Sequence, residues 1–160
     1  MADGETNYRL IGVTLDEATV ESRSREIDQE REVAIYDLLE ANYFEPVGSP
    51  GGPYLLYLGT SEGRLIFDVR LVDDTPHGRI MLSMAPLRRV IKDYFLICES
   101  YYRAIREAPL SQIEALDMGR RGVHDEGSGI LVERLKGKIA LDFDTARRLF
   151  ALICMLHMKA

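Results

Sequence analysis

A short segment of the chain, GRRGVHDEGSG at residues 119–129, concentrates residue types that bind or transfer charge. Two arginines, a histidine and two acids lie among four glycines. Guanidinium groups bind carboxylates and phosphates through paired hydrogen bonds, and a histidine titrates near neutral pH. The segment is therefore a candidate site for a small anion. Its five candidate binding residues are Arg120, Arg121, His124, Asp125 and Glu126.

The same glycines allow a purely structural interpretation. A glycine inside a helix costs about 1 kcal/mol relative to alanine, so a helix running through all four would lose roughly 4 kcal/mol. We therefore predict a break between two helices. Gly119 or Gly122 would end the first helix, and Asp125, Glu126 or Ser128 would start the second. One of the two arginines is expected to pair with one of the two acids and to hold the histidine at the rim of a binding surface.

Other kinds of site have weaker support. Cys154, His157 and His124 could be combined into a metal site, but the first two follow an apolar helical pattern typical of a core, so no metal is expected. Cys98 has a similar setting, and both cysteines are expected to be reduced. The sequence contains neither a nucleophile motif nor a glycine-rich phosphate loop. We therefore expect no cofactor.

The charges are divided unevenly along the chain. Residues 1–85 contain 7 Lys and Arg against 16 Asp and Glu, whereas residues 86–160 contain 13 against 10. An acidic first half argues against binding to duplex DNA, because phosphate binding needs a basic surface. The arginine pairs at 88–89 and 147–148 could gather an anion, but we interpret them as solvated helix faces.

The sequence also bears on location. No apolar run approaches the roughly 20 residues that a helix needs to cross a bilayer. The amino-terminal stretch MADGETNYRL lacks the basic start and the apolar core of a secretory signal. We therefore expect a cytoplasmic protein without a membrane partner.

Residues 8–85 predict a strand, a helix and a three-stranded meander. Period-two alternation predicts the strand at about residues 11–15, and apolar residues at helical spacing predict the helix at 25–42. Three apolar stretches, PYLLYL, GRLIFDVRLV and GRIMLSM, are separated by short turns, so they are expected to pair antiparallel. Alternate residues of the middle stretch are apolar, which predicts one buried face.

Residues 86–160 predict a mainly helical part. The first helix runs from residue 86 to about Glu107. A second is expected to start at Ser111, whose hydroxyl forms a capping-box pattern with an acid three residues on. The last is expected to start at Asp142 or Asp144, both good capping residues. Before it, the piece KIAL is expected to add an edge strand to the sheet.

Together these elements predict an α+β fold, with an antiparallel sheet of about four strands packed against a mainly C-terminal helical layer. The length of 160 residues is usual for a single domain, which we expect to span the whole chain with residues 1–7 disordered. On the helix that follows residue 86, Phe95, Ile97 and Tyr102 lie outside the main apolar stripe. Such side chains would be exposed in a monomer, so a homodimer is predicted.

Four stretches resemble one bacterial family, number 0262 in the series of uncharacterised protein families. They are LRRVIKDYFLICESYY, SQIEALDMGRRGVHDEGS, RLKGKI and DFDTARRLF. The resemblance covers nearly the whole chain. It implies a bacterial cytosolic origin and a single domain, and it supplies no activity, substrate or catalytic residue.

Two functions remain open at this point. The first is a non-enzymatic interaction or regulatory module that recognises another protein or a second copy of the chain. The alternative is a small enzyme or ligand-binding protein whose anionic substrate meets the arginines, His124 and Glu126. A ligand site should gather these side chains in a concave pocket, whereas a module should spread them over its surface.

Overall fold

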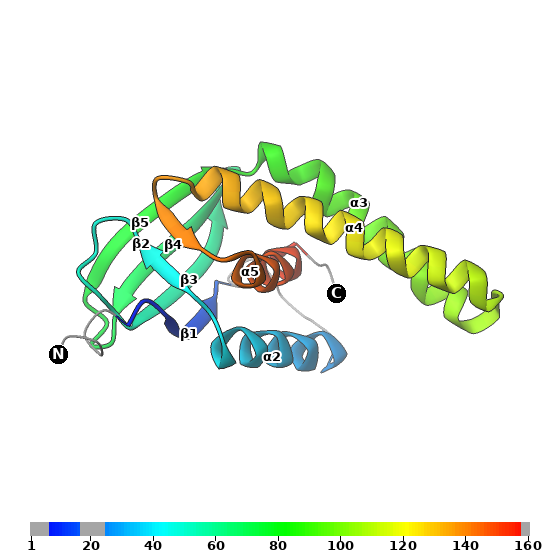
Figure 1. Cartoon of the computed structure of the whole chain (residues 1–160), viewed down its shortest axis with the longest axis horizontal. Coiled ribbons are helices and arrows are strands. Elements are labelled where there is room, and N and C mark those ends of the chain that lie inside the picture. Colours follow the sequence, from blue (N-terminus) through cyan, green and yellow to red (C-terminus); the bar gives the residue numbers. More distant parts are fainter. Residues whose placement is uncertain (1–6, 17–24, 158–160) are drawn as a thin grey trace.

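The computed structural model describes residues 7–16 and 25–157, and Figure 1 shows how their helices and strands are arranged. The disorder expected for residues 1–7 concerns, apart from Asn7, residues outside this part of the chain. The elements in chain order are β1 (Leu10–Leu15), α2 (Arg25–Glu40), β2 (Phe44–Pro46), β3 (Tyr54–Ser61), β4 (Arg64–Leu71), β5 (Pro76–Ser83), α3 (Ala85–Glu107), α4 (Leu110–Leu135), β6 (Ile139–Leu141) and α5 (Phe143–Leu156).

The α+β fold is confirmed, because a four-stranded sheet in the order β1-β3-β4-β5 is combined with long helices. The strands β3, β4 and β5 pair antiparallel, as the meander predicted. The buried face of β4 is also confirmed. Its apolar residues Leu65, Phe67 and Val69 are fully buried, and the residues between them are partly exposed.

Two features of the strands differ from the sequence prediction. The sheet is mixed and not antiparallel throughout, because β1 pairs parallel with β3. In the chain α2 lies between these strands, and it supplies the crossover that parallel pairing requires. The KIAL segment forms β6, but β6 does not extend this sheet. It pairs antiparallel with β2 in a separate two-stranded sheet.

The core lies between the four-stranded sheet and α5. The apolar face of α5 is fully buried against the sheet. Leu56 and Leu58 of β3 are fully buried, as are Leu149, Phe150 and Ile153 of α5. Burying each such side chain contributes about 1.5–3 kcal/mol. Since α4 and α2 pack on the same α5 helix, α5 joins the sheet to the other helices.

A single asparagine fixes α2 to the sheet. The side-chain nitrogen of Asn42 donates hydrogen bonds to the carbonyl oxygens of Leu38 (2.9 Å) and Leu10 (3.1 Å). Its side-chain oxygen accepts a hydrogen bond from the Leu10 N–H at 2.8 Å. The end of α2 and the start of β1 are therefore held by one amide group.

Of the two predicted helix caps, the one before α5 is confirmed and the one before α4 is wrong. Asp142 caps α5, because its carboxylate accepts a hydrogen bond from the Thr145 N–H at 3.0 Å. Ser111 does not cap α4. The helix begins at Leu110 with Pro109 in the cap position, which places Ser111 inside the first turn and leaves the cap without a side-chain hydrogen bond.

Helices α3 and α4 form a hairpin whose far half extends beyond the sheet and α5 (Figure 1). The break predicted within residues 119–129 is wrong, because α4 runs without interruption from Leu110 to Leu135. Two of its glycines lie where another helix presses on the backbone. A Cβ atom would lie 2.7 Å from Ile97 Cδ1 at Gly119 and 2.7 Å from Phe150 Cε2 at Gly127. Close packing at these points offsets the local cost of glycine.

None of the helices within the described residues is long and apolar enough to cross a bilayer.

Candidate functional site

The continuity of α4 decides which of the predicted binding residues meet. Successive side chains on a helix are turned by about 100°, so neighbours in the sequence point in different directions. Arg120, Arg121 and His124 line one pocket. Asp125 and Glu126 do not line it, and they form ion pairs with two other helices. The structure therefore brings three of the five predicted residues together.

The pocket has a volume of about 250 Å³ and lies where α3, α4 and α5 meet. Besides the three α4 residues, it is lined by Tyr94 of α3 and Arg147 of α5. Sequence reasoning missed both. The arginine pair at 147–148 was the available signal, but its proximity to α4 depends on how the helices pack. We call this the arginine pocket.

Asp117 holds the two neighbouring arginines of α4. Its carboxylate lies 2.6 Å from an Arg120 guanidinium nitrogen and 2.9 Å from one of Arg121. The Arg120 hydrogen bond lowers the pKa of Asp117 below its usual range. Arg120 also stacks over the Tyr101 ring, 4.6 Å from the ring centre. The expected pairing of these arginines with Asp125 or Glu126 is therefore wrong, because Asp117 lies one turn away on the same helix.

The two acids that follow instead connect α4 to its neighbours. Asp125 Oδ1 lies 3.1 Å from Arg147 Nε on α5. Glu126 accepts a hydrogen bond of 2.6 Å from Arg89 on α3, and Arg89 also bonds Asp93 at 2.8 Å. These groups are about half exposed, so solvent screens each pair and its contribution to stability is small.

His124 is packed between two aromatic rings. Its ring centre lies 5.3 Å from that of Tyr94 and 5.1 Å from that of Phe150. Burial, assisted by the positive charge of Arg147, lowers the pKa of His124 to about 4. The expectation that this histidine titrates near neutral pH is therefore wrong. At pH 7 it is a neutral ring with one N–H donor.

This low pKa should make stability depend on pH. In the unfolded chain the histidine is protonated as pH falls below about 6.5. In the folded protein it stays neutral until the pH reaches about 4. The free energy of unfolding should therefore decrease from pH 6.5 to pH 4. In His124→Phe this component should disappear, and urea unfolding at several pH values measures it. Equal pH dependence in both proteins would contradict the assignment.

Three buried nitrogen atoms of the arginine pocket lack a hydrogen-bond partner. Among the described residues, four buried side-chain nitrogens are in this condition: Arg70 Nε, Arg120 Nε, His124 Nδ1 and Arg147 Nε. Arg147 Nε is close to Asp125 but does not make a hydrogen bond with it. An unpaired buried polar group costs about 1–3 kcal/mol, and here all but one of these nitrogens lie in a single place.

The metal alternative gains no support from the geometry. Cys154 is buried, and burial raises the pKa of its thiol. His157 Nδ1 lies 2.9 Å from the Ile153 carbonyl oxygen. Among residues 7–16 and 25–157, no three His, Cys, Asp or Glu side chains are placed to hold a metal ion.

A serine–histidine contact was not anticipated from the sequence. Ser49 Oγ lies 2.8 Å from His77 Nε2, a separation that would allow the histidine to act as a general base. The same oxygen lies 2.7 Å from the Tyr54 hydroxyl and accepts a hydrogen bond from the Gly51 N–H. A hydroxyl has one donor and two acceptor positions, so all of them are used. The contact ties the loop before β3 to β5.

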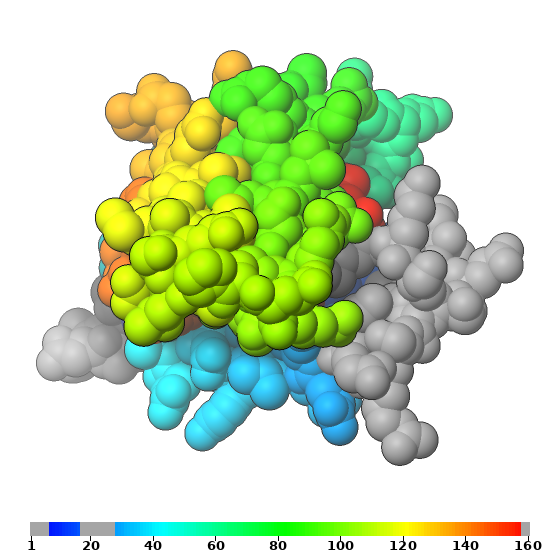
Figure 2. All heavy atoms as spheres, turned by 90° about the vertical axis from the view of Figure 1, so that its right-hand side faces the viewer, coloured from blue at the N-terminus to red at the C-terminus, as the bar shows by residue number. Residues whose placement is uncertain are grey.

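The far half of the hairpin presents a different kind of surface. We call residues 96–120 the distal hairpin. Figure 2 shows its end facing the viewer. Five of its large apolar side chains are exposed: Leu96, Tyr102, Ile105, Leu110 and Met118. Of the residues that motivated a dimer, Tyr102 is exposed, whereas Phe95 packs on the core and Ile97 is half-buried against Gly119.

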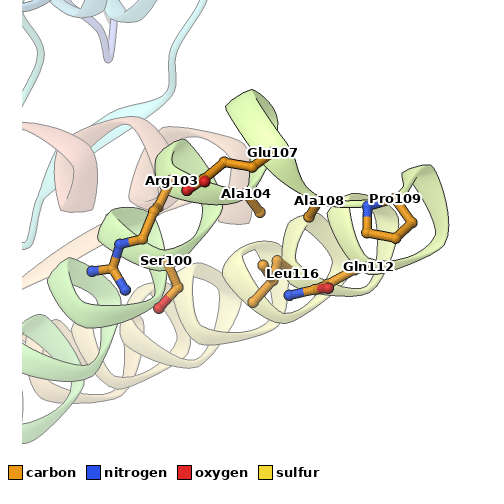
Figure 3. Close-up of a pocket in the computed structure, with 8 residues that line it drawn as sticks. All are labelled: Ser100, Arg103, Ala104, Glu107, Ala108, Pro109, Gln112 and Leu116. Atoms are coloured by element: carbon orange, nitrogen blue, oxygen red, sulfur yellow. The ribbon is translucent and has the colours of Figure 1, made fainter.

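A groove of about 460 Å³ lies at the end of the distal hairpin. Figure 3 shows that its walls come from both helices and the turn between them. The lining residues are Ser100, Arg103, Ala104, Glu107, Ala108, Pro109, Gln112 and Leu116. The lining combines polar and apolar side chains.

Comparison with known proteins matches nearly the whole chain to one family. The family model described as uncharacterised protein family (UPF0262) matches residues 7–159. The chain is 58% identical over 156 residues to a UPF0262 protein of Maricaulis maris, covering 98% of each. It is 56% identical over 155 residues to one of Rhizobium meliloti, covering 97% of this chain and 98% of the relative. No solved structure matches the chain.

Proposed function

The chain belongs to the uncharacterised protein family UPF0262. From the surfaces of this chain, we propose that it is a non-enzymatic interaction module. The distal hairpin is the binding surface in this proposal. We place the protein in the bacterial cytosol, with a protein partner and not duplex DNA or a membrane.

One observation carries the proposal, namely the apolar side chains on an element that projects from the core. Tyr102, Leu110 and Met118 are all more than half exposed, and they belong to the α3–α4 hairpin, whose far half extends beyond the sheet and α5 (Figure 1). Removing apolar surface from water stabilises a protein or a complex by about 25 cal/mol per Å². Side chains that stay exposed do not contribute this free energy. Exposed apolar area concentrated on a projecting element is typical of a surface that another protein covers.

A second copy of the chain is the partner that we infer. The distal hairpin contains three arginines and four acids, so two copies can meet without strong repulsion between like charges. Two hairpins that pack against each other give a four-helix arrangement, and a twofold contact lets one surface serve both partners. Association would bury the exposed apolar side chains of both copies.

Sedimentation equilibrium tests this proposal. The unaltered chain has a mass of 18.1 kDa, so a dimer should give about twice this value at tens of micromolar. Met118→Glu should weaken association at least about tenfold, because a carboxylate would have to be buried in the contact.

The matched control is Val72→Glu, which alters an exposed apolar side chain beyond the end of β4, away from the hairpin. It should leave association unchanged. A monomer mass for the unaltered protein at tens of micromolar would contradict the proposal. An equal effect of both variants on association would show that the two copies do not meet through the hairpin.

A further inference from the structure

The arginine pocket supports an inference that does not depend on the association of two copies. Its donors come from the three successive helices α3, α4 and α5, and they surround one volume of about 250 Å³. The buried nitrogens Arg120 Nε, His124 Nδ1 and Arg147 Nε have no hydrogen-bond partner among the described residues. The two arginine nitrogens are N–H donors, and buried donors are normally paired, so a group that accepts hydrogen bonds would complete this site.

The charges around the pocket favour an anion. Three guanidinium groups, those of Arg120, Arg121 and Arg147, line it. Two carboxylates oppose them, because Asp117 bonds the first two arginines and Asp125 lies beside the third. The balance leaves one positive charge without a counter-ion within the cluster.

The two remaining lining groups are neutral hydrogen-bonding groups at pH 7. Burial raises the pKa of the Tyr94 phenol, so its hydroxyl keeps its proton. Burial also keeps His124 uncharged, which leaves it one N–H to donate. Neither group adds negative charge that would repel an anion.

We propose that the arginine pocket binds a small molecule through an oxyanion group, a phosphate or a carboxylate, held by Arg120, Arg121 and Arg147 with His124. Guanidinium groups match the planar or tetrahedral arrangement of these oxygens with paired hydrogen bonds. The volume is just below the range of about 300–1,000 Å³ typical of small-molecule sites, so the ligand is a metabolite-sized anion and not a polymer.

Calorimetric titration with inorganic phosphate and, separately, with succinate tests the site and distinguishes the two oxyanions. Sodium chloride at equal ionic strength is the reference, because screening alone changes with added salt. At least one of the two anions should bind saturably, with a dissociation constant below about 1 mM. Arg121→Gln should weaken this binding at least about tenfold, because it removes a charge-assisted hydrogen bond from a largely exposed side chain without affecting the core.

Two further variants complete the design. Arg147→Gln should weaken binding to a similar degree, since it alters the opposite wall of the pocket. Arg89→Gln is the matched control, because Arg89 is ion-paired between α3 and α4 but does not line the pocket, and it should bind as the unaltered protein does. The proposal is overturned if neither anion binds above the chloride reference, or if both pocket variants bind as tightly as the control.

Discussion

Phe150→Ala should lower the free energy of unfolding by about 3–5 kcal/mol, the usual cost of removing a large aromatic ring from a packed core. Phe150 is fully buried on α5. Its ring contacts those of His124 and Tyr94 and fills the space against the backbone of α4 at Gly127. Domains of this size are stable by about 5–15 kcal/mol, so the loss is a large fraction of the total.

Urea unfolding followed by circular dichroism measures this loss. Phe143→Ala is the control, because Phe143 lies on the same helix with 45% of its surface exposed. Its replacement should change the free energy of unfolding by less than about 1 kcal/mol. Equal effects of the two substitutions would show that the contact between α4 and α5 does not support the fold.

Gly127→Ala should destabilise the protein by about 1–3 kcal/mol, although alanine is the better helix former. A Cβ atom there would lie 2.7 Å from Phe150 Cε2 and closer to two other atoms of the ring, so the two helices would have to move apart. Thermal or urea unfolding of the variant measures the change.

Two other glycines of α4 provide controls of opposite sign. A Cβ atom at Gly122 or Gly129 would meet no atom within 4 Å. Replacing either with alanine should therefore stabilise the protein by about 0.5–1 kcal/mol, since only the helix propensity changes. A stabilising effect of Gly127→Ala comparable to these controls would contradict the close contact of α4 with Phe150.

The sequence was sufficient for features that depend on neighbouring residues. The α+β class, the meander, the extent of α3 and the Asp142 cap were all predicted from periodicity and capping residues, and the structure confirms them. Each of these signals lies within a few residues of the feature that it predicts. Local physics is therefore enough to identify them.

The errors share a different cause. Glycine's cost in an isolated helix predicted a break in α4, but Gly127 is required by Phe150, which is distant in the sequence. The pairing of β1 depends on which strand lies beside it after α2 has crossed over. Two of the five residues that line the arginine pocket were missed for the same reason, because Tyr94 and Arg147 reach α4 only through the packing of the helices. Tertiary contacts of this kind leave no short-range pattern.

The rate of methionine oxidation at two positions tests the central claim, that the distal hairpin is a contact surface. Met118 on the hairpin is 72% exposed in the single chain, and Met81 on β5, which serves as the internal control, is 47% exposed. If two copies meet through the hairpin, raising the protein concentration through the association range should slow the oxidation of Met118 by hydrogen peroxide at least about threefold, because association removes its sulfur from solvent. Met81 should react at a constant rate. A Met118 rate that stays constant over the same range, as that of Met81 does, would contradict the account.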